Sequence, residues 1–306
     1  MTRSPSRHAP ADGGDLVRAP LLRSARGELP PNVALMQAVM HAQEPDDVER
    51  AIAHAWQEID GAGAAGRLHR LAHLWTSTPD AFRTVKKILA VVDHGRPPEF
   101  DGSPPVQWSS IFDGAAEISP EASTALYSLG RADLLAAATE EIVNWLRRGG
   151  LLARDRTILE IGCGIGRFVQ ALSGEARRVV GVDISPGMLR VARQRCRCCA
   201  NALLVRGSGQ DLAMFADASF HLVLSVDAFP YLFLSGLAAR HIKETARVLV
   251  PGGALLILNY SYRGDRSQDR SDIAELARET GMAVLRDGSC DLTLWDGIMF
   301  HLQRPA

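Results

Sequence analysis

The chain has 306 residues, of which 46% are hydrophobic and 23% are charged, and its formal net charge is −1. This composition predicts a globular protein of about two domains, and it excludes fibrous and wholly disordered chains. Because the net charge is close to zero, bulk electrostatics favour neither nucleic acid nor an anionic membrane as a partner. The balance of charge therefore favours a small or neutral substrate.

The cysteines and the N-terminal residues indicate the cellular compartment of the protein. The five cysteines have no histidine at the spacing of a zinc site, so we expect no metal and reduced thiols. Asp12 and Asp15 interrupt the N-terminal stretch before an apolar run long enough for a secretory signal. We also find no uncharged apolar stretch of membrane-spanning length. These features predict a cytoplasmic protein with no nucleic-acid and no membrane partner.

The first third of the chain divides into three predicted parts. Residues 1–31 carry five prolines and little apolar periodicity, which predicts a disordered arm. Apolar residues then recur at helical spacing in four successive runs, which predicts a helical region over residues 32–94. Residues 95–118 open with a proline- and glycine-rich stretch and are interpreted as a linker.

The role of the helical region is left open between a lid, a substrate cap, an interaction module and a homodimer surface. His69 and His73 within it have the i, i+4 spacing that metal ligands on a helix use. No acidic third ligand lies nearby in the sequence, so we interpret them as a solvated or partly buried pair.

Residues 119–306 alternate between helical and strand patterns. A helix is predicted over 132–146, and five strands are predicted at 157–161, 179–183, 203–206, 220–226 and 254–259. Such alternation is typical of right-handed crossovers and a parallel sheet with helices on both faces. Residues 282–286 and 297–303 follow as two strands that form a terminal antiparallel pair. The sequence therefore predicts a Rossmann-like α/β domain with a seven-stranded, mostly parallel sheet.

Three polar or glycine-rich segments follow successive strands, where open α/β sheets bind ligands. The first is the run from Glu160 to Gly166, with glycines at 162, 164 and 166. The second is Asp183, which lies 21 residues after Gly162, at the spacing of an acid that binds ribose hydroxyls. The third is the loop 207–212, placed to hold an adenine edge. A carboxylate at Glu160 repels a pyrophosphate but attracts an ammonium group, so the pattern favours a phosphate-free nucleoside.

These segments resemble the motifs of the class I S-adenosylmethionine-dependent methyltransferases. The glycine run is GxGxG after an acidic strand end, and residues 180–189 are similar to the second motif of that family. Residues 220–225 and 244–253 are similar to its fourth-strand motif and to the segment that follows it. The resemblance covers residues 120–306, and it implies a methyltransferase with S-adenosylmethionine as cofactor.

The resemblance also implies roles for individual residues. Gly162 and Gly164 would pack against the methionine part of the cofactor, with Glu160 near its amino group. Asp183 would bind both ribose hydroxyls and Ile184 would pack on the adenine. Further cofactor contacts are expected at positions within or beside the same motifs: Cys163, Gly166, Met188, Gln210, Asp211, Leu212 and Ser225. Many relatives have an acid where this chain has Ser208, so hydrogen bonding to the adenine is expected from Asp211 or from backbone.

Catalysis by such a site requires little beyond alignment of the acceptor, because a sulfonium methyl is already activated. A general base is needed only where the acceptor must lose a proton. Candidates are Asp227 and Tyr231 after the fourth strand and Asn259, Tyr260 and Tyr262 after the fifth. The apolar stretch 227–234 is typical of core, and part of it is suited to line a pocket for an aromatic or lipid-like acceptor.

The leading hypothesis is methyl transfer to a small-molecule acceptor that is apolar or aromatic. One alternative is a methyltransferase for a protein or carrier-bound substrate that is docked by the N-terminal helices. Another is a non-catalytic, S-adenosylmethionine-binding regulatory subunit.

Overall fold

A computed structural model describes residues 13–92 and 104–306 of the chain. Residues 1–12 of the expected arm and 93–103 of the expected linker lie outside the described residues. Contacts divide the chain into two compact units, Met1–Lys86 and Lys87–Ala306. Each unit is described by itself below.

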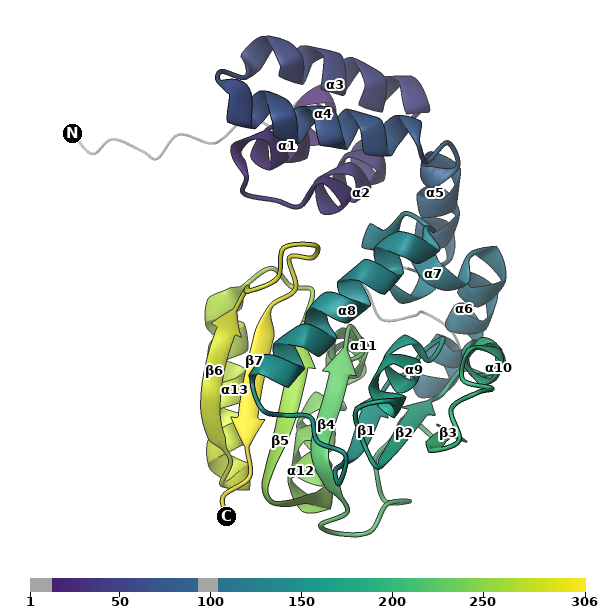
Figure 1. The fold of residues 1–306 in the computed structure, drawn as a ribbon, viewed down its shortest axis with the longest axis vertical. Coiled ribbons are helices and arrows are strands. Elements are labelled where there is room, and N and C mark those ends of the chain that lie inside the picture. Colours follow the sequence, from purple (N-terminus) through teal and green to yellow (C-terminus); the bar gives the residue numbers. More distant parts are fainter. Residues whose placement is uncertain (1–12, 93–103) are drawn as a thin grey trace, which may run out of the picture. The chain divides into compact units, whose positions relative to one another are not determined.

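The first unit is helical, as the apolar periodicity predicts. It contains α1 (Gly13–Arg26), α2 (Pro31–His41), α3 (Pro45–Glu58) and α4 (Ala62–Thr76), and α5 (Ala81–Val91) crosses its boundary. The α3 helix begins at a capping box in which the side chains of Glu44 and Asp47 accept the free N–H groups of the first turn. Within the described residues, α1 packs against α2, α3 and α4 (Figure 1).

Helix α1 occupies a stretch that we expected to be a disordered arm. Val17, Leu21 and Ala25 recur every fourth residue and are at most 4% exposed, so they form one buried face. Pro20 lies inside this helix. A proline lowers the helix propensity of the segment, but it does not prevent a helix whose apolar face is buried. Burial of this face therefore outweighs the prolines from which the arm was predicted.

The second unit is built on a seven-stranded sheet with the order β3-β2-β1-β4-β5-β7-β6. Its strands are β1 (Thr157–Ile161), β2 (Arg178–Asp183), β3 (Ala202–Arg206), β4 (Phe220–Val226), β5 (Leu249–Leu258), β6 (Ala283–Ser289) and β7 (Met299–Gln303). Neighbours from β3 to β5 pair in parallel, whereas β7 pairs antiparallel with both β5 and β6. The predicted Rossmann-like fold class, with its terminal antiparallel pair, is confirmed.

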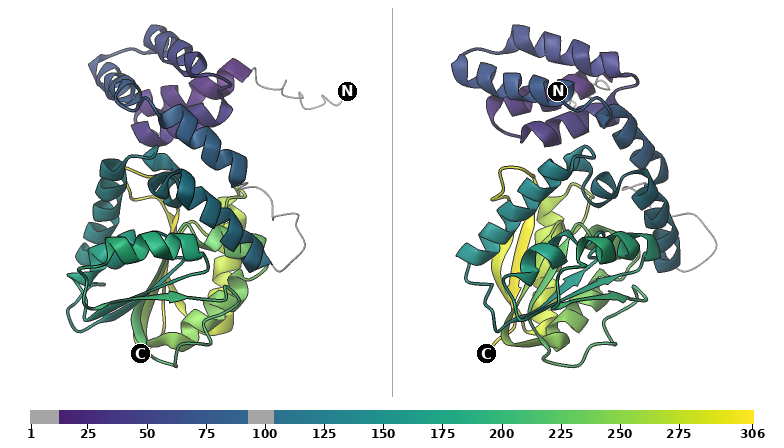
Figure 2. Two further views of the ribbon diagram at one scale, coloured as in Figure 1. Left: turned by 90° about the vertical axis from the view of Figure 1, so that its right-hand side faces the viewer. Right: turned by 45° about the vertical axis from the view of Figure 1, so that its right-hand side comes forward.

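Helices cover both faces of this sheet. Figure 1 shows α8 (Ala132–Arg148), α9 (Arg167–Ser173) and α10 (Pro186–Arg195) in front, with α12 (Ala238–Val248) and α13 (Arg266–Thr280) behind. The turned views in Figure 2 show the same two helix layers on either side of the strands. All five residues of β1 are buried, because a central parallel strand is covered on both faces. The short α11 (Phe229–Leu234) follows β4 directly.

Three further elements precede α8. They are α6 (Pro104–Ile118), α7 (Pro120–Thr124) and the short 3₁₀ helix η1 (Leu126–Ser128). Helix α6 lies in the stretch that we expected to be a linker, and it packs on α10 and α7. In the described part of the chain, no helix is both long enough and apolar enough to cross a membrane.

Candidate active site

The glycine run forms the turn between β1 and α9. Gly162, Gly164 and Gly166 have positive φ angles of 70°, 49° and 76°, which other residues rarely adopt. The N–H groups of Gly162 and Cys163 both donate to the carbonyl of Val182, at 2.8 and 3.0 Å. A Cβ atom placed on Gly162 would lie 2.3 Å from the Cβ of Ala228. Glycine at this position therefore lets the segment after β4 approach the turn directly.

Glu160 lies under this turn and is 2% exposed. One carboxylate oxygen accepts the N–H of Val169, while Oε2 has no hydrogen-bond partner. Burial raises the pKa of the Glu160 carboxyl well above its usual range, and the charge of Arg167 opposes that rise. An unpartnered buried carboxylate oxygen is costly, and a bound cationic donor would satisfy it.

Thr124 supplies a second unpartnered polar atom at the turn. Its buried Oγ1 has no hydrogen-bond partner and lies 3.4 Å from the position that a Cβ on Gly164 would take. Sequence reasoning did not identify Thr124, because it belongs to α7, outside the recognised motifs. Two polar atoms without partners thus adjoin one glycine turn.

Asp183 ends β2, the strand beside β1. Its Oδ2 accepts the N–H of Gly164 and its Oδ1 accepts the N–H of Ser185, both at 2.8 Å. Burial raises the pKa of the Asp183 carboxyl, and these two backbone donors oppose the rise. A carboxylate can accept about four hydrogen bonds, so the Asp183 carboxylate retains capacity for a ligand hydroxyl.

Helix α6 contacts the same region from a different part of the chain. Asp113 Oδ1 accepts from Ser185 Oγ at 2.5 Å and from the N–H of Gly187 at 2.7 Å. The hydroxyl of Ser109 donates to the carbonyl of Ile184 at 3.0 Å. Helix α6 is thereby fixed to the end of β2 and the start of α10, beside Asp183.

Several predicted contacts lie in the packing around the turn. Cys163 and Ser225 are at most 1% exposed, Met188 is 3% exposed, and Gly166 abuts Ala192 of α10. The hydroxyl of Ser225 donates to the carbonyl of Ile161 at 3.2 Å, which joins β4 to the end of β1. These residues shape and support the turn.

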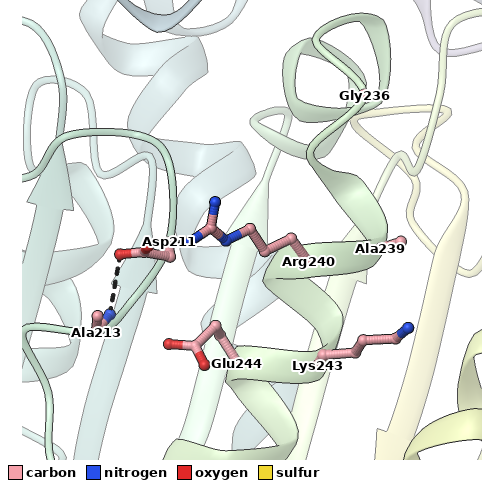
Figure 3. A pocket seen from close by; sticks show the side chains of 7 residues that line it. All are labelled: Asp211, Ala213, Gly236, Ala239, Arg240, Lys243 and Glu244. Atoms are coloured by element: carbon pink, nitrogen blue, oxygen red, sulfur yellow. Dashed lines mark hydrogen bonds and ion pairs between the residues drawn. The ribbon is translucent and has the colours of Figure 1, made fainter.

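The polar groups of the loop after β3 form hydrogen bonds and an ion pair with other groups of the protein. Asp211 Oδ2 forms a 2.7 Å ion pair with Arg240, and its Oδ1 accepts the N–H of Ala213 (Figure 3). Asp211 and Arg240 line a surface pocket together with Gly236, Lys243 and Glu244. The N–H of Gln210 donates to Ser208 Oγ, and Leu212 is 2% exposed within the core.

The catalytic candidates separate into two environments. Tyr260 is 4% exposed and packs among Phe229, Phe233 and Phe300, and burial raises the pKa of its hydroxyl to about 12. Asp227 instead has its Oδ1 bonded by Asn259 Nδ2 and by the Tyr262 hydroxyl, each at 2.8 Å. Burial raises the pKa of the Asp227 carboxyl to about 6.

Arg167, which sequence reasoning did not single out, is a buried cation at the start of α9. It is 4% exposed, donates to the Tyr127 hydroxyl at 3.1 Å and lies 4.6 Å from the Phe168 ring centroid. Its charge opposes the rise in pKa that burial causes at both Glu160 and Asp227. The sequence feature that could have identified Arg167 is its position directly after the third glycine of the run.

Metal ligation has no support from the residues that the structure describes. Among residues 13–92 and 104–306, no three His, Cys, Asp or Glu side chains are grouped to hold a metal ion. His69 and His73 both lie on α4.

Comparisons with known proteins agree with this arrangement. Residues 159–257 match the family described as "Methyltransferase domain". The chain is 35% identical over 105 residues to a demethylmenaquinone methyltransferase of Tropheryma whipplei, covering 34% of this chain and 42% of that protein. It is 34% identical over 121 residues to a 2-methyl-6-phytyl-1,4-hydroquinone methyltransferase of Synechocystis, covering 39% of this chain and 37% of that protein. The chain thus spans less than half the length of these two relatives.

A solved structure supports the fold. Phosphoethanolamine N-methyltransferase 1 of Haemonchus contortus, in complex with phosphoethanolamine and S-adenosylhomocysteine, matches with a TM-score of 0.53 at 18% identity. The match covers 66% of this chain and 49% of that one.

The sheet order, the glycine turn and the acidic end of β2 define a nucleoside-binding α/β domain of the Rossmann-like kind. The family match over residues 159–257 agrees with the resemblance to the class I S-adenosylmethionine-dependent methyltransferase superfamily that the motifs indicate. The cofactor of that superfamily is S-adenosylmethionine, and the residues present fit it. Glu160 Oε2 and Thr124 Oγ1 are buried polar atoms without partners at the turn, suited to an amino-acid group, and Asp183 retains capacity for hydroxyls.

Proposed function

We propose that this protein transfers a methyl group from S-adenosylmethionine to a small-molecule acceptor that is apolar or aromatic. The observation that supports cofactor binding most directly is the unpartnered Oε2 of buried Glu160, one strand away from Asp183. When bound, S-adenosylmethionine supplies a methyl group that its sulfonium centre already activates. The protein's own part is to bind, to align the acceptor and to exclude water.

Aromatic side chains near the strand ends support the choice of acceptor. Trp108 and Phe112 of α6 contact the Tyr231 ring edge-on, with ring centroids 4.8 and 4.9 Å away, and Tyr231 contacts Tyr262 at 6.0 Å. The names of the two relatives above refer to a menaquinone precursor and to a phytyl hydroquinone, which are aromatic or quinonoid and apolar. Both observations favour a ring-containing acceptor.

Calorimetric titration with S-adenosylmethionine and with S-adenosylhomocysteine tests the cofactor part of this proposal. We expect micromolar binding to the wild type and none of comparable strength for NAD. Asp183→Ala removes a charged acceptor, which costs about 3 kcal/mol, or ~10²-fold in affinity. Asp155→Ala, an exposed acid before β1, serves as the matched control and is expected to bind as the wild type does. Absence of binding to the wild type would refute the proposal.

The acceptor part is tested with isotopically labelled cofactor and a panel of reduced quinones, phenols and aliphatic amines. Label incorporated into the ring-containing members is the expected result. Transfer confined to amines, or to a protein or carrier substrate, would contradict the proposed acceptor class while leaving the cofactor assignment intact.

A further inference from the structure

Two neighbouring strands end in the same unusual backbone conformation. Asp227 after β4 and Asn259 after β5 have φ angles of 57° and 62°. The left-handed region costs a residue with a side chain about 1 kcal/mol or more, so it persists where other contacts enforce it. Here the two residues are bonded to each other, through Asn259 Nδ2 and Asp227 Oδ1.

Asn259 is itself fixed by the segment before β7. Its backbone N–H donates to the carbonyl of Ile298, and its Oδ1 accepts the N–H of Ile298, both at 2.8 Å. The backbone N–H of Asp227 donates to the carbonyl of Leu258 at 3.0 Å. The Asp227 carboxylate is therefore held by two strand ends and a third segment, which is the rigidity that a reacting group needs.

The two oxygens of Asp227 differ in their contacts. Oδ1 receives both the Asn259 amide and the Tyr262 hydroxyl, and the Tyr262 hydroxyl is also bonded to that of Tyr231. Because Tyr262 has a single O–H, which it gives to Asp227, Tyr231 is the donor in that second bond. Across the described ranges, 13–92 and 104–306, no donor reaches Oδ2. One carboxylate oxygen is held in place and the other remains available to a ligand.

Asp227 also adjoins the glycine turn between β1 and α9. Ala228, the next residue, packs against Gly162, because glycine has no Cβ that would occupy this space. Arg167, which acts electrostatically on Glu160, acts on Asp227 as well. On its other side lie the rings of Tyr231 and Tyr262, and Tyr262 is 38% exposed. The two rings are nearly perpendicular, at 82°, so a planar molecule stacked on the exposed Tyr262 ring would meet the edge of Tyr231 and lie beside the Asp227 carboxylate.

We propose that Asp227 is the general base of this site and that the acceptor is a hydroxylated aromatic molecule of the phenol, catechol or hydroquinone class. This inference rests on the proposed function and assigns it an acceptor chemistry. In the proton-transfer step the acceptor O–H bond breaks, its electron pair stays on the acceptor oxygen, and the proton binds Asp227 Oδ2. Asp227 changes from carboxylate to carboxylic acid while the acceptor changes from phenol to phenolate, so charge and atoms balance.

The electrostatic surroundings suit this role. Burial raises the pKa of Asp227 to about 6, against the opposing effects of Asn259, Tyr262 and Arg167, and Asp296 adds to the rise. Tyr231 and Tyr127 are the other titratable groups coupled to it. A base with its pKa near 6 is ionised at neutral pH yet holds a proton better than an exposed aspartate, which brings it closer to a phenol in basicity.

The test uses the full-length, cofactor-free protein with 2-naphthol and its methyl ether, 2-methoxynaphthalene, as matched probes. Calorimetry from pH 5 to pH 8 is expected to show the 2-naphthol affinity of the wild type rising about tenfold through pH 6. In this range the probe keeps its proton and Asp227 loses its own. The methyl ether has no O–H to donate, and its affinity is expected to stay flat with pH.

Asp227→Asn is expected to abolish this pH dependence and to bind the two probes alike. Asp217→Asn, the same change at an exposed aspartate before β4, is expected to keep the wild-type profile. S-adenosylhomocysteine binding to each variant reports folding, and it separates failure of this inference from failure of the proposed function. Absence of 2-naphthol binding, a flat wild-type profile, or a profile that persists in Asp227→Asn would overturn the proposal.

Discussion

Replacement of Glu160 by glutamine tests how the cofactor site is built. The carboxyl is 2% exposed, one oxygen accepts the Val169 N–H, and Oε2 has no partner. Glutamine has nearly the same shape and retains a carbonyl oxygen for Val169. It lacks the negative charge that a bound ammonium group would meet. Loss of one charge-assisted hydrogen bond is worth about 2 kcal/mol, so we expect S-adenosylhomocysteine to bind ~30-fold more weakly to Glu160→Gln.

The same substitution is expected to change the response to pH. Because burial raises the pKa of Glu160 in the folded protein, its contribution to stability is present below its unfolded pKa and is lost as pH rises through the folded value. Glutamine does not titrate, so Glu160→Gln should gain stability relative to the wild type as pH rises. Ligand affinity should move the opposite way: the wild type releases a proton on binding and binds more tightly at higher pH, whereas the variant does not.

Calorimetry in two buffers of different ionisation enthalpy measures both the affinity and the protons released, and thermal unfolding at pH 6 and pH 8 measures the stability term. Glu140→Gln, on the exposed face of α8, is the control and is expected to match the wild type in both. Wild-type affinity in Glu160→Gln, with the pH dependence intact, would refute the assignment of this carboxylate to the ligand.

Two further substitutions probe how the site is assembled. Gly162→Ala combines left-handed strain with a Cβ that lies 2.3 Å from the Cβ of Ala228, so we expect a loss of about 3 kcal/mol in unfolding free energy. Gly150→Ala, with a φ of 67° and no atom within 4 Å of the added Cβ, should lose only about 1 kcal/mol, and equal losses in thermal unfolding would contradict the contact. Asp113→Ala removes the acceptor that holds α6 to α10, and faster amide hydrogen exchange over residues 104–118 is expected. The exposed Ser110→Ala should leave that exchange unchanged, and unchanged exchange in Asp113→Ala would argue against the anchor.

The sheet was predictable because its signals are local. The β1 strand carries the apolar residues Ile158, Leu159 and Ile161, as a strand buried on both faces favours, and the glycines follow it directly. The order of strand, turn and acidic strand end along the chain was enough to show the resemblance with which the family match over residues 159–257 agrees. Prolines led to the opposite error at α1, where burial of one apolar face outweighs them.

The rest of the site depends on contacts between residues far apart in the sequence. Asp113 reaches Ser185 across 72 residues, and Asp227 reaches Asn259 across 32. No local sequence pattern predicts either contact. In addition, α6 begins with two prolines, which are also typical of a linker. The sequence identified Asp227 as one catalytic candidate among several. The structure distinguishes it from the buried Tyr260, because the Asp227 carboxylate accepts a hydrogen bond from Tyr262, whose side chain is exposed.

The order of the strands in the sheet has a consequence for synthesis on the ribosome. Strand β7 follows β5 and β6 in the chain, yet it lies between them. Until residues 299–303 have been made, β5 has an open backbone edge and β6 has no neighbour with which to pair. An open edge of apolar strand is prone to pair with other chains. The nascent protein is therefore expected to depend on its last strand for protection from aggregation, even though the glycine turn and its acidic partner are complete more than 100 residues earlier.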